Sequence, residues 1–308
     1  KSSLKDEVVS LGGFCTAEII SDRGLVLTNH HCAFGQIQSH STVSNDYLRD
    51  GFWAMDMSEE LANEGLSVSF LVRMEDMTER INAALDTVSE ESRKSVIRKL
   101  SAEIVAEATA ETHYNARVKS FFGGNDFYLM VYETFTDIRL VGAPPSSIGK
   151  YGGDTDNWMW PRHTGDFSMF RIYSDKDNNP AGYSEDNIPY TPKHSLPVST
   201  AGVKEGDYAM ILGYPGSTDR FLTSLGVQQA VEIEQPARVK VRRMKLDIME
   251  EGMNKEQKIR IQYASKHARV SNYWKYFIGQ SEQLVRNNVF AKKEKIEKDF
   301  LTLSLIHI

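Results

Sequence analysis

Short alternating or apolar runs dominate the first 235 residues, and most are bounded by Gly, Pro, Asn or Asp. Runs of this length, separated by turn residues, predict a mainly β region folded as a sandwich or barrel. The runs that carry this prediction cover residues 14–20, 25–28, 66–72, 127–132, 137–141, 167–173 and 208–212. Turns are marked by Asp22-Arg23-Gly24 and by Gly123-Gly124-Asn125-Asp126.

Helical periodicity interrupts this pattern near residues 90–108, where apolar residues recur at intervals of three and four. We expect this helix to be an insertion packed on the β region. From residue 236 onward helix formers dominate and the apolar residues form broken helical stripes. The predicted organisation is therefore a β region over 1–235, followed over 236–308 by the beginning of an α-helical domain that is truncated at residue 308.

Composition and charge narrow the function classes. The 308 residues are 41% hydrophobic and carry a net charge of −6, which excludes a disordered or collagen-like chain. No apolar run approaches the roughly 18 residues that a membrane span needs. Residues 236–300 hold 16 Lys and Arg against 8 Asp and Glu. These bases alternate with acids and no nucleic-acid-binding motif is present, so we interpret them as a solvated face.

The two cysteines, Cys15 and Cys32, flank a predicted hairpin and stand close to His30 and His31. If both lie on neighbouring strands, a disulfide would close a loop of about 17 residues and contribute roughly 3 kcal/mol in the chain-entropy model. Two buried free thiols are an equal alternative at this point. A zinc site is disfavoured, because no Cys-x-x-Cys or His-x-x-x-His pair completes four ligands, and no metal or other cofactor is expected.

An apolar strand that ends in Thr28-Asn29-His30-His31-Cys32, after a strand that carries Cys15, resembles the first barrel of the chymotrypsin-like serine peptidases. The resemblance implies that His31 is the general base and that His30 is structural. Such a base needs a carboxylate that holds its tautomer. Asp166, at the start of the run 167–173, resembles the aspartate of these peptidases. We interpret Asp154 and Asp156, in a loop rich in glycine and aromatic residues, as turn formers.

A larger set of motifs resembles the bacterial dipeptidyl-peptidase 7 and 11 family over almost the whole chain. The motifs are GLVLTNHHC at 24–32, YLRDGFWAM at 47–55, GAPPSSIGK at 142–150, DTDNWMWPRHTGD at 154–166 and GYPGST at 213–218. The resemblance implies a chymotrypsin-like double β-barrel with an inserted α-helical domain that caps the cleft. It also implies removal of dipeptides from the free amino end of peptides, in the periplasm, at the cell surface or outside the cell.

Site residues follow from the same resemblance. Asn157 and Trp158 match the pair that lines the pocket for the substrate's N-terminus, and Asn272 is a further contact from the helical domain. This fits the chemistry, because an ammonium group needs oxygen acceptors and is attracted to an aromatic face. A disulfide between Cys15 and Cys32 would clip the segment that carries His31. Peptides with a free N-terminus are the expected partners, and a homodimer is compatible with this reading.

One expected feature is missing. A chymotrypsin-like nucleophile lies in a Gly-x-Ser-Gly turn whose backbone N–H groups form the oxyanion hole, and this sequence has none. The chain also starts at Lys1, without an initiator Met or a signal segment. We therefore expect an N-terminal fragment, inactive alone, with two of three triad residues. The alternatives are a chymotrypsin-like endopeptidase and a non-catalytic peptide-binding module.

Overall fold

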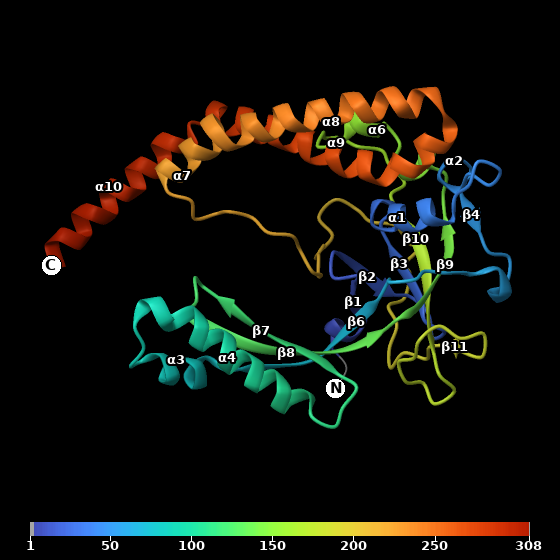
Figure 1. Ribbon diagram of the computed structural model, residues 1–308, viewed down its shortest axis with the longest axis horizontal. Coiled ribbons are helices and arrows are strands. Elements are labelled where there is room, and N and C mark those ends of the chain that lie inside the picture. Colours follow the sequence, from blue (N-terminus) through green and yellow to red (C-terminus); the bar gives the residue numbers. More distant parts are fainter. Residues whose placement is uncertain (1–2, 308) are drawn as a thin grey trace. The chain divides into compact units, whose positions relative to one another are not determined.

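The chain folds into two compact units in the computed structural model, which describes residues 3–307 (Figure 1). The first, called the sheet unit, consists of residues 1–32, 54–142 and 168–215. The second, called the helical unit, consists of residues 33–53, 143–167 and 216–308. This interleaved division differs from the single boundary expected near residue 236. Sequence periodicity reports local structure, and it does not reveal that segments 33–53 and 143–167 pack with distant helices.

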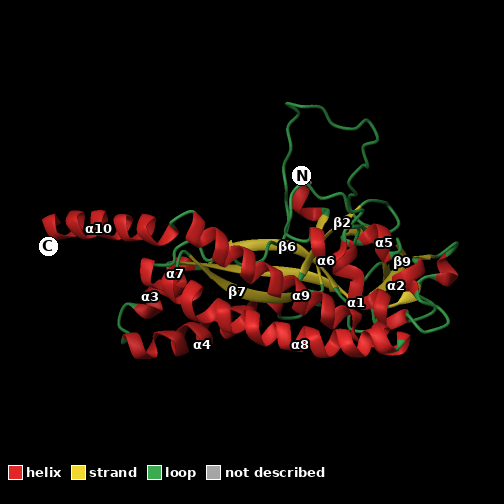
Figure 2. Cartoon of the chain, turned by 90° about the horizontal axis from the view of Figure 1, so that it is seen from above, coloured by secondary structure: helices red, strands yellow, loops and turns green. Residues whose placement is uncertain are grey.

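A large antiparallel sheet forms the sheet unit, and Figure 2 shows its strands in yellow. Its strands are β1 (Val8–Leu11), β2 (Cys15–Ile19), β3 (Leu25–Thr28), β5 (Leu61–Ala62), β6 (Val68–Asp76), β7 (Asn115–Phe121), β8 (Asp126–Phe135), β9 (Asp137–Ala143), β10 (Ser168–Ser174) and β11 (Ile188–Pro189). They follow one another in the order β9-β10-β3-β2-β1-β6-β8-β7, with β11 on β10 and β5 on β9. The 3₁₀ turns Leu4–Asp6 and Met57–Glu59 flank this sheet.

Two helices pack on the β7–β8 hairpin of the sheet unit. α3 (Thr78–Leu85) and α4 (Glu90–Thr109) lie along the hairpin in Figure 1. They bury a separate apolar cluster that consists of Ile81, Leu85, Ile104, Phe127, Leu129 and Val131. The hairpin and its helices therefore have a small core of their own, because the apolar stripe of α4 is covered by alternate residues of β8.

Buried charges fix strand β10, which follows Asp166 in the chain. Arg171 on β10 donates from Nε to Glu60 Oε1 at 2.9 Å, and the Tyr173 hydroxyl donates to Glu60 Oε2 at 2.8 Å. Burial, together with the hydrogen bond to Glu60, raises the pKa of Tyr173 far above its ordinary value, so the phenol stays protonated and remains a donor. Because removal of one partner would leave a buried charge unpaired, these contacts set the register of β10 firmly.

One predicted strand is wrong. Residues 208–212 form no strand, and the described segment 190–223, the yellow-to-orange thread that leads to α7 in Figure 1, contains no helix or strand. The large apolar side chains of residues 208–212 are open to solvent, with Ile211 99% exposed, and Phe221 is 95% exposed. A short apolar run forms a strand only where a neighbouring strand accepts its backbone hydrogen bonds, and no described strand pairs with residues 208–212.

The helical unit is built around a long antiparallel helical hairpin. Its elements are most of α1 (His30–His40), then α2 (Tyr47–Asp50), β4 (Phe52–Trp53), α5 (Ser146–Gly149), α6 (Gly153–Asp156), α7 (Ser224–Gln229), the π-helix η3 (Ala230–Glu234), α8 (Gln235–Lys255), α9 (Gln257–Arg286) and α10 (Val289–His307). α8 and α9 run side by side in Figure 1, with Leu246, Ile261 and Phe277 buried between helices. In the described part of the chain, no helix has the length and apolarity needed to cross a membrane.

A buried carboxylate joins the N-terminal segment of the helical unit to the hairpin. Asp46 is 1% exposed and accepts a hydrogen bond from the backbone N–H of Arg49, which caps α2. The same side chain accepts from Gln257 Nε2 at 3.3 Å and forms an ion pair with Arg260, both on α9. Segment 33–53 is therefore attached to the first turn of α9, although more than two hundred residues separate them in sequence.

Candidate active site

His31 stands at the beginning of a helix beside a disulfide. β3 ends at Thr28 and α1 begins at His30, so Cys32 lies in the first turn of a helix. The expectation that both cysteines lie on neighbouring strands is therefore wrong, since only Cys15 is on a strand. The structure nevertheless bonds Cys15 to Cys32, with their Cα atoms 6.1 Å apart. The Cys sulfurs and a ring nitrogen of His31 all lie within 4.8 Å of one another.

The two adjacent histidines differ in environment. His30 is 1% exposed and belongs to the core, whereas His31 is exposed. A general base must reach its substrate, and a buried ring does not. Of the two, His31 is therefore the histidine that is suited to proton transfer, and the disulfide beside it holds the backbone turn from which its side chain projects.

Asp166 precedes β10 by two residues, and the side chain is half-buried. Strand pairing places Ser168, the first residue of β10, opposite Thr28, the last residue of β3. His31 follows the end of β3 by three residues. Asp166 itself belongs to the 143–167 segment of the helical unit, where the backbone N–H of the preceding Gly165 donates to Ile148 O at 3.0 Å.

The structure brings Asn157, Trp158 and Asn272 together within the helical unit. Asn157 Nδ2 donates to Asn272 Oδ1 at 2.8 Å, and Trp158 Nε1 donates to the main-chain oxygen of Asn272 at 3.1 Å. Arg162 Nη1 donates to Asn157 Oδ1 at 3.3 Å. Each amide oxygen has two lone pairs, so both side-chain oxygens keep one acceptor position in this arrangement. The cluster is thus suited to a ligand with several N–H donors.

Trp158 is held in an unusual conformation. Its φ is +60°, in the left-handed region that costs a non-glycine residue about 1 kcal/mol or more. The side chain is nevertheless 57% exposed, so burial of the indole does not compensate for this cost. The indole hydrogen bond to Asn272 and a contact with Tyr276, whose ring centroid is 5.0 Å away, hold it in place. A strained, exposed indole fixed at one position is typical of a binding surface.

Asp154 anchors the loop that carries this pair. Its carboxylate accepts from Lys150 Nζ at 2.7 Å and from Ser271 Oγ at 2.8 Å. Its main-chain oxygen accepts from Lys275 Nζ at 2.9 Å. Burial alone would raise the pKa of Asp154, but the hydrogen bonds and positive charge of Lys150, with the bond from Ser271, outweigh it, so the pKa lies below its ordinary value.

The sequence pattern predicted a turn-forming role for Asp154 and no role for Ser271 or Lys275. The four-residue spacing of Lys150 and Asp154 favours an ion pair, although Lys150 lies before α6 and the two residues do not share a helical turn. The contact with Ser271 joins positions 117 residues apart, and no local pattern indicates it.

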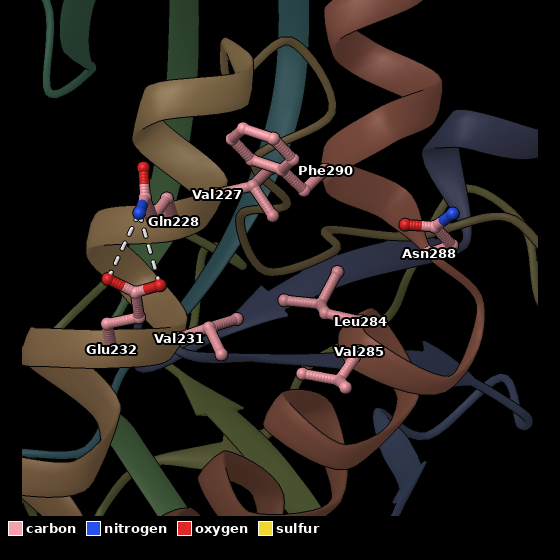
Figure 3. A pocket seen from close by; sticks show the side chains of 8 residues that line it. All are labelled: Val227, Gln228, Val231, Glu232, Leu284, Val285, Asn288 and Phe290. Atoms are coloured by element: carbon pink, nitrogen blue, oxygen red, sulfur yellow. Dashed lines mark hydrogen bonds between the residues drawn. The ribbon is translucent and has the colours of Figure 1, made fainter.

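A separate apolar cavity lies at the other end of the helical hairpin (Figure 3). It has a volume of about 280 Å³ and lies between the α7–η3 segment and the α9–α10 junction. Its walls are formed by Val227, Val231, Leu284, Val285 and Phe290, while Gln228 Nε2 donates to Glu232 at 3.1 Å. The cavity contains no histidine, serine or cysteine in its lining, so it lacks the groups that hydrolysis needs.

A profile of the Peptidase S46 family matches residues 1–305, and the chain belongs to this family.

Several dipeptidyl-peptidases are about half identical in sequence to this chain. The chain is 51% identical over 301 residues to the Asp/Glu-specific dipeptidyl-peptidase of Capnocytophaga gingivalis, which covers 97% of this chain and 42% of that protein. It is likewise 51% identical over 299 residues to the dipeptidyl-peptidase 7 of Porphyromonas endodontalis, which covers 97% and 37%. The fold matches the crystal structure of Porphyromonas endodontalis DPP11 in complex with the dipeptide Arg-Asp, with a TM-score of 0.94 and 43% identity, over 100% of this chain and 45% of that one. The chain thus spans less than half the length of these relatives.

The lowered pKa of Asp154 predicts a defined pH dependence. Its pKa is lower in the folded than in the unfolded chain, where about 3.9 is usual. Its contribution to the free energy of unfolding is therefore complete above about pH 5 and is lost as the pH falls through the lowered pKa. The free energy of unfolding, measured by urea denaturation from pH 7 to pH 3, should differ between wild type and Asp154→Asn, and this difference should shrink as the pH falls. A difference in the free energy of unfolding that stays constant over this pH range would contradict the lowered pKa of Asp154.

Proposed function

We propose that this chain is part of a serine dipeptidyl-peptidase that releases dipeptides from the free amino end of peptides. The observation that carries the proposal is the cluster of Asn157, Trp158 and Asn272, which is suited to a charged amine. Membership of the Peptidase S46 family and the names of the relatives support the same activity.

On this proposal, the amine cluster determines which peptide bond is cleaved. An ammonium group has three N–H donors, and the side-chain oxygens of Asn157 and Asn272 each keep an acceptor position. The exposed indole of Trp158 adds a face that attracts a cation. An anchor for the terminal amine fixes how far the chain extends toward the reacting atoms, and this selects one peptide bond.

Catalysis on this proposal uses a histidine base and a carboxylate on a chymotrypsin-like first barrel. His31 deprotonates the nucleophilic serine, and Asp166 holds the imidazole in the required tautomer. The exposure of His31 and the pairing of Thr28 with Ser168 support these roles. We place the serine, with the second barrel and the rest of the helical domain, in the part of the longer family members that this chain does not match.

A free amino end should be essential for turnover by the full-length enzyme. A dipeptidyl reporter with a free N-terminus should be cleaved at least about a hundredfold faster, by kcat/KM, than its N-acetylated form, because acetylation removes the charge that the cluster binds. Equal kcat/KM values for the two reporters would favour the chymotrypsin-like endopeptidase instead.

Loss of the base should abolish turnover without unfolding the enzyme. In the full-length enzyme, His31→Gln should lower kcat by about a thousandfold or more, with the melting temperature nearly unchanged because the side chain is exposed. His113→Gln is the matched control, since His113 is also exposed and contacts Glu133. If His31→Gln retained activity close to that of the control, His31 would not be the base.

We further propose that the enzyme works in an oxidising compartment, such as the periplasm, the cell surface or the medium. The bond between Cys15 and Cys32, the two cysteines of the sequence, supports this location. In protein purified from its natural location and digested without reductant, the peptides that carry Cys15 and Cys32 should be recovered as one disulfide-linked pair by mass spectrometry. Recovery of both peptides with free thiols would count against the oxidising compartment.

A further inference from the structure

We propose that Asp154 is a positioning residue of the amine pocket, which acts by holding Asn157 and Trp158 against Asn272. The proposal rests on the function proposed above. Asp154 is bonded to α9 at two points, since its carboxylate accepts from Ser271 Oγ at 2.8 Å and its main-chain oxygen accepts from Lys275 Nζ at 2.9 Å.

The Asp154 contact with α9 is adjacent to the contacts of the pocket. Ser271 directly precedes Asn272 on α9, and Asp154 precedes Asn157 by three residues. Between these chain segments the order of contacts is Asp154 with Ser271, Asn157 with Asn272, and Trp158 with Asn272. The hydrogen bond from Ser271 to Asp154 therefore lies next to the hydrogen bond from Asn157 to Asn272. Both bonds require the same distance between the loop and α9.

The loop has little structure of its own to keep that spacing. α6 is a single turn of four residues, and it follows Gly152 and starts at Gly153, whose φ values are +77° and +54°. An isolated turn of this length is not stable in water. The loop therefore takes its shape from α9, a helix of 30 residues, through the contacts that Asp154 makes.

Asp154 itself is not positioned to bind the substrate amine. One carboxylate oxygen faces the Lys150 ammonium and the other faces the Ser271 hydroxyl. The Lys150 ammonium already compensates the charge of that carboxylate, which leaves little attraction for a second cation. We therefore infer that Asp154 acts by positioning Asn157 and Trp158, and not by contacting the ligand itself.

Steady-state kinetics of the full-length enzyme on a free dipeptidyl reporter tests this role. Asp154→Asn should raise KM about tenfold and change kcat by less than about twofold, because the pocket is displaced while the reacting groups are not. Ser271→Ala should raise KM in the same direction by about threefold. Ser271→Ala removes a hydrogen bond to Asp154 without changing any charge. A higher KM in this variant therefore reports displacement of the loop and not a change in local charge.

Asp299→Asn is the matched control. Asp299 also pairs with a lysine four residues earlier, Lys295 at 2.6 Å, but on α10 and largely exposed. This control variant should keep the KM and kcat of the wild type. Active enzyme is counted by titration with a covalent serine inhibitor, so partial unfolding lowers that count and leaves KM unchanged.

A double-mutant cycle with Asn272→Ala asks whether Asp154 acts through the pocket. The tenfold effect of Asp154→Asn on KM should shrink to less than about twofold when Asn272 is already replaced, since residues that act through one contact are not additive. Independent, multiplied effects would overturn the proposal.

The outcomes separate this proposal from the function it rests on. If the wild type cleaves free and acetylated reporters equally, the proposed exopeptidase function is wrong. If the wild type requires a free amine but Asp154→Asn matches Asp299→Asn, the positioning role is wrong and the function stands. Should Asp154→Asn fail to fold, Ser271→Ala decides, and an unchanged KM in that variant overturns the positioning role.

Discussion

A loop without a stable fold of its own must be held against a long helix, and the candidate amine pocket depends on this constraint. Asn157 and Trp158 both bond to Asn272, one through its side chain and one through its main chain. The helix contributes rigidity, because α9 packs along α8 with Ile261 and Phe277 buried. The geometry of the pocket is therefore fixed by helix packing at a distance from it.

Several features of the fold were predictable because they are local. Leu25–Thr28 and Ser168–Ser174 are strands where the apolar runs indicated them, and the helix Glu90–Thr109 has the three-and-four spacing of an amphipathic helix. Strand β7 was not recognised, because five of its seven residues are exposed and its apolar signal is weak. Residues 208–212 failed for the opposite reason, since they form a continuous apolar run but no described strand pairs with them.

The candidate site was predicted by resemblance and not by periodicity. Asn157, Trp158 and Asn272 carry no local pattern that brings them together, and motif similarity alone named them. The network around Asp154 escaped notice because a carboxylate in a glycine-rich loop usually serves the turn itself. Cys32 was assigned to a strand by extending the apolar run Leu25–Thr28 through three polar residues, whereas the backbone turns into α1 at His30.

The left-handed backbone at Trp158 also bears on how this chain could change. Glycine adopts that conformation without steric cost, so replacing the tryptophan by glycine would relax the loop locally while removing the indole. Local stability and ligand recognition therefore favour different residues at position 158. Selection for thermal stability alone would therefore favour glycine at position 158, at the cost of the exposed indole surface.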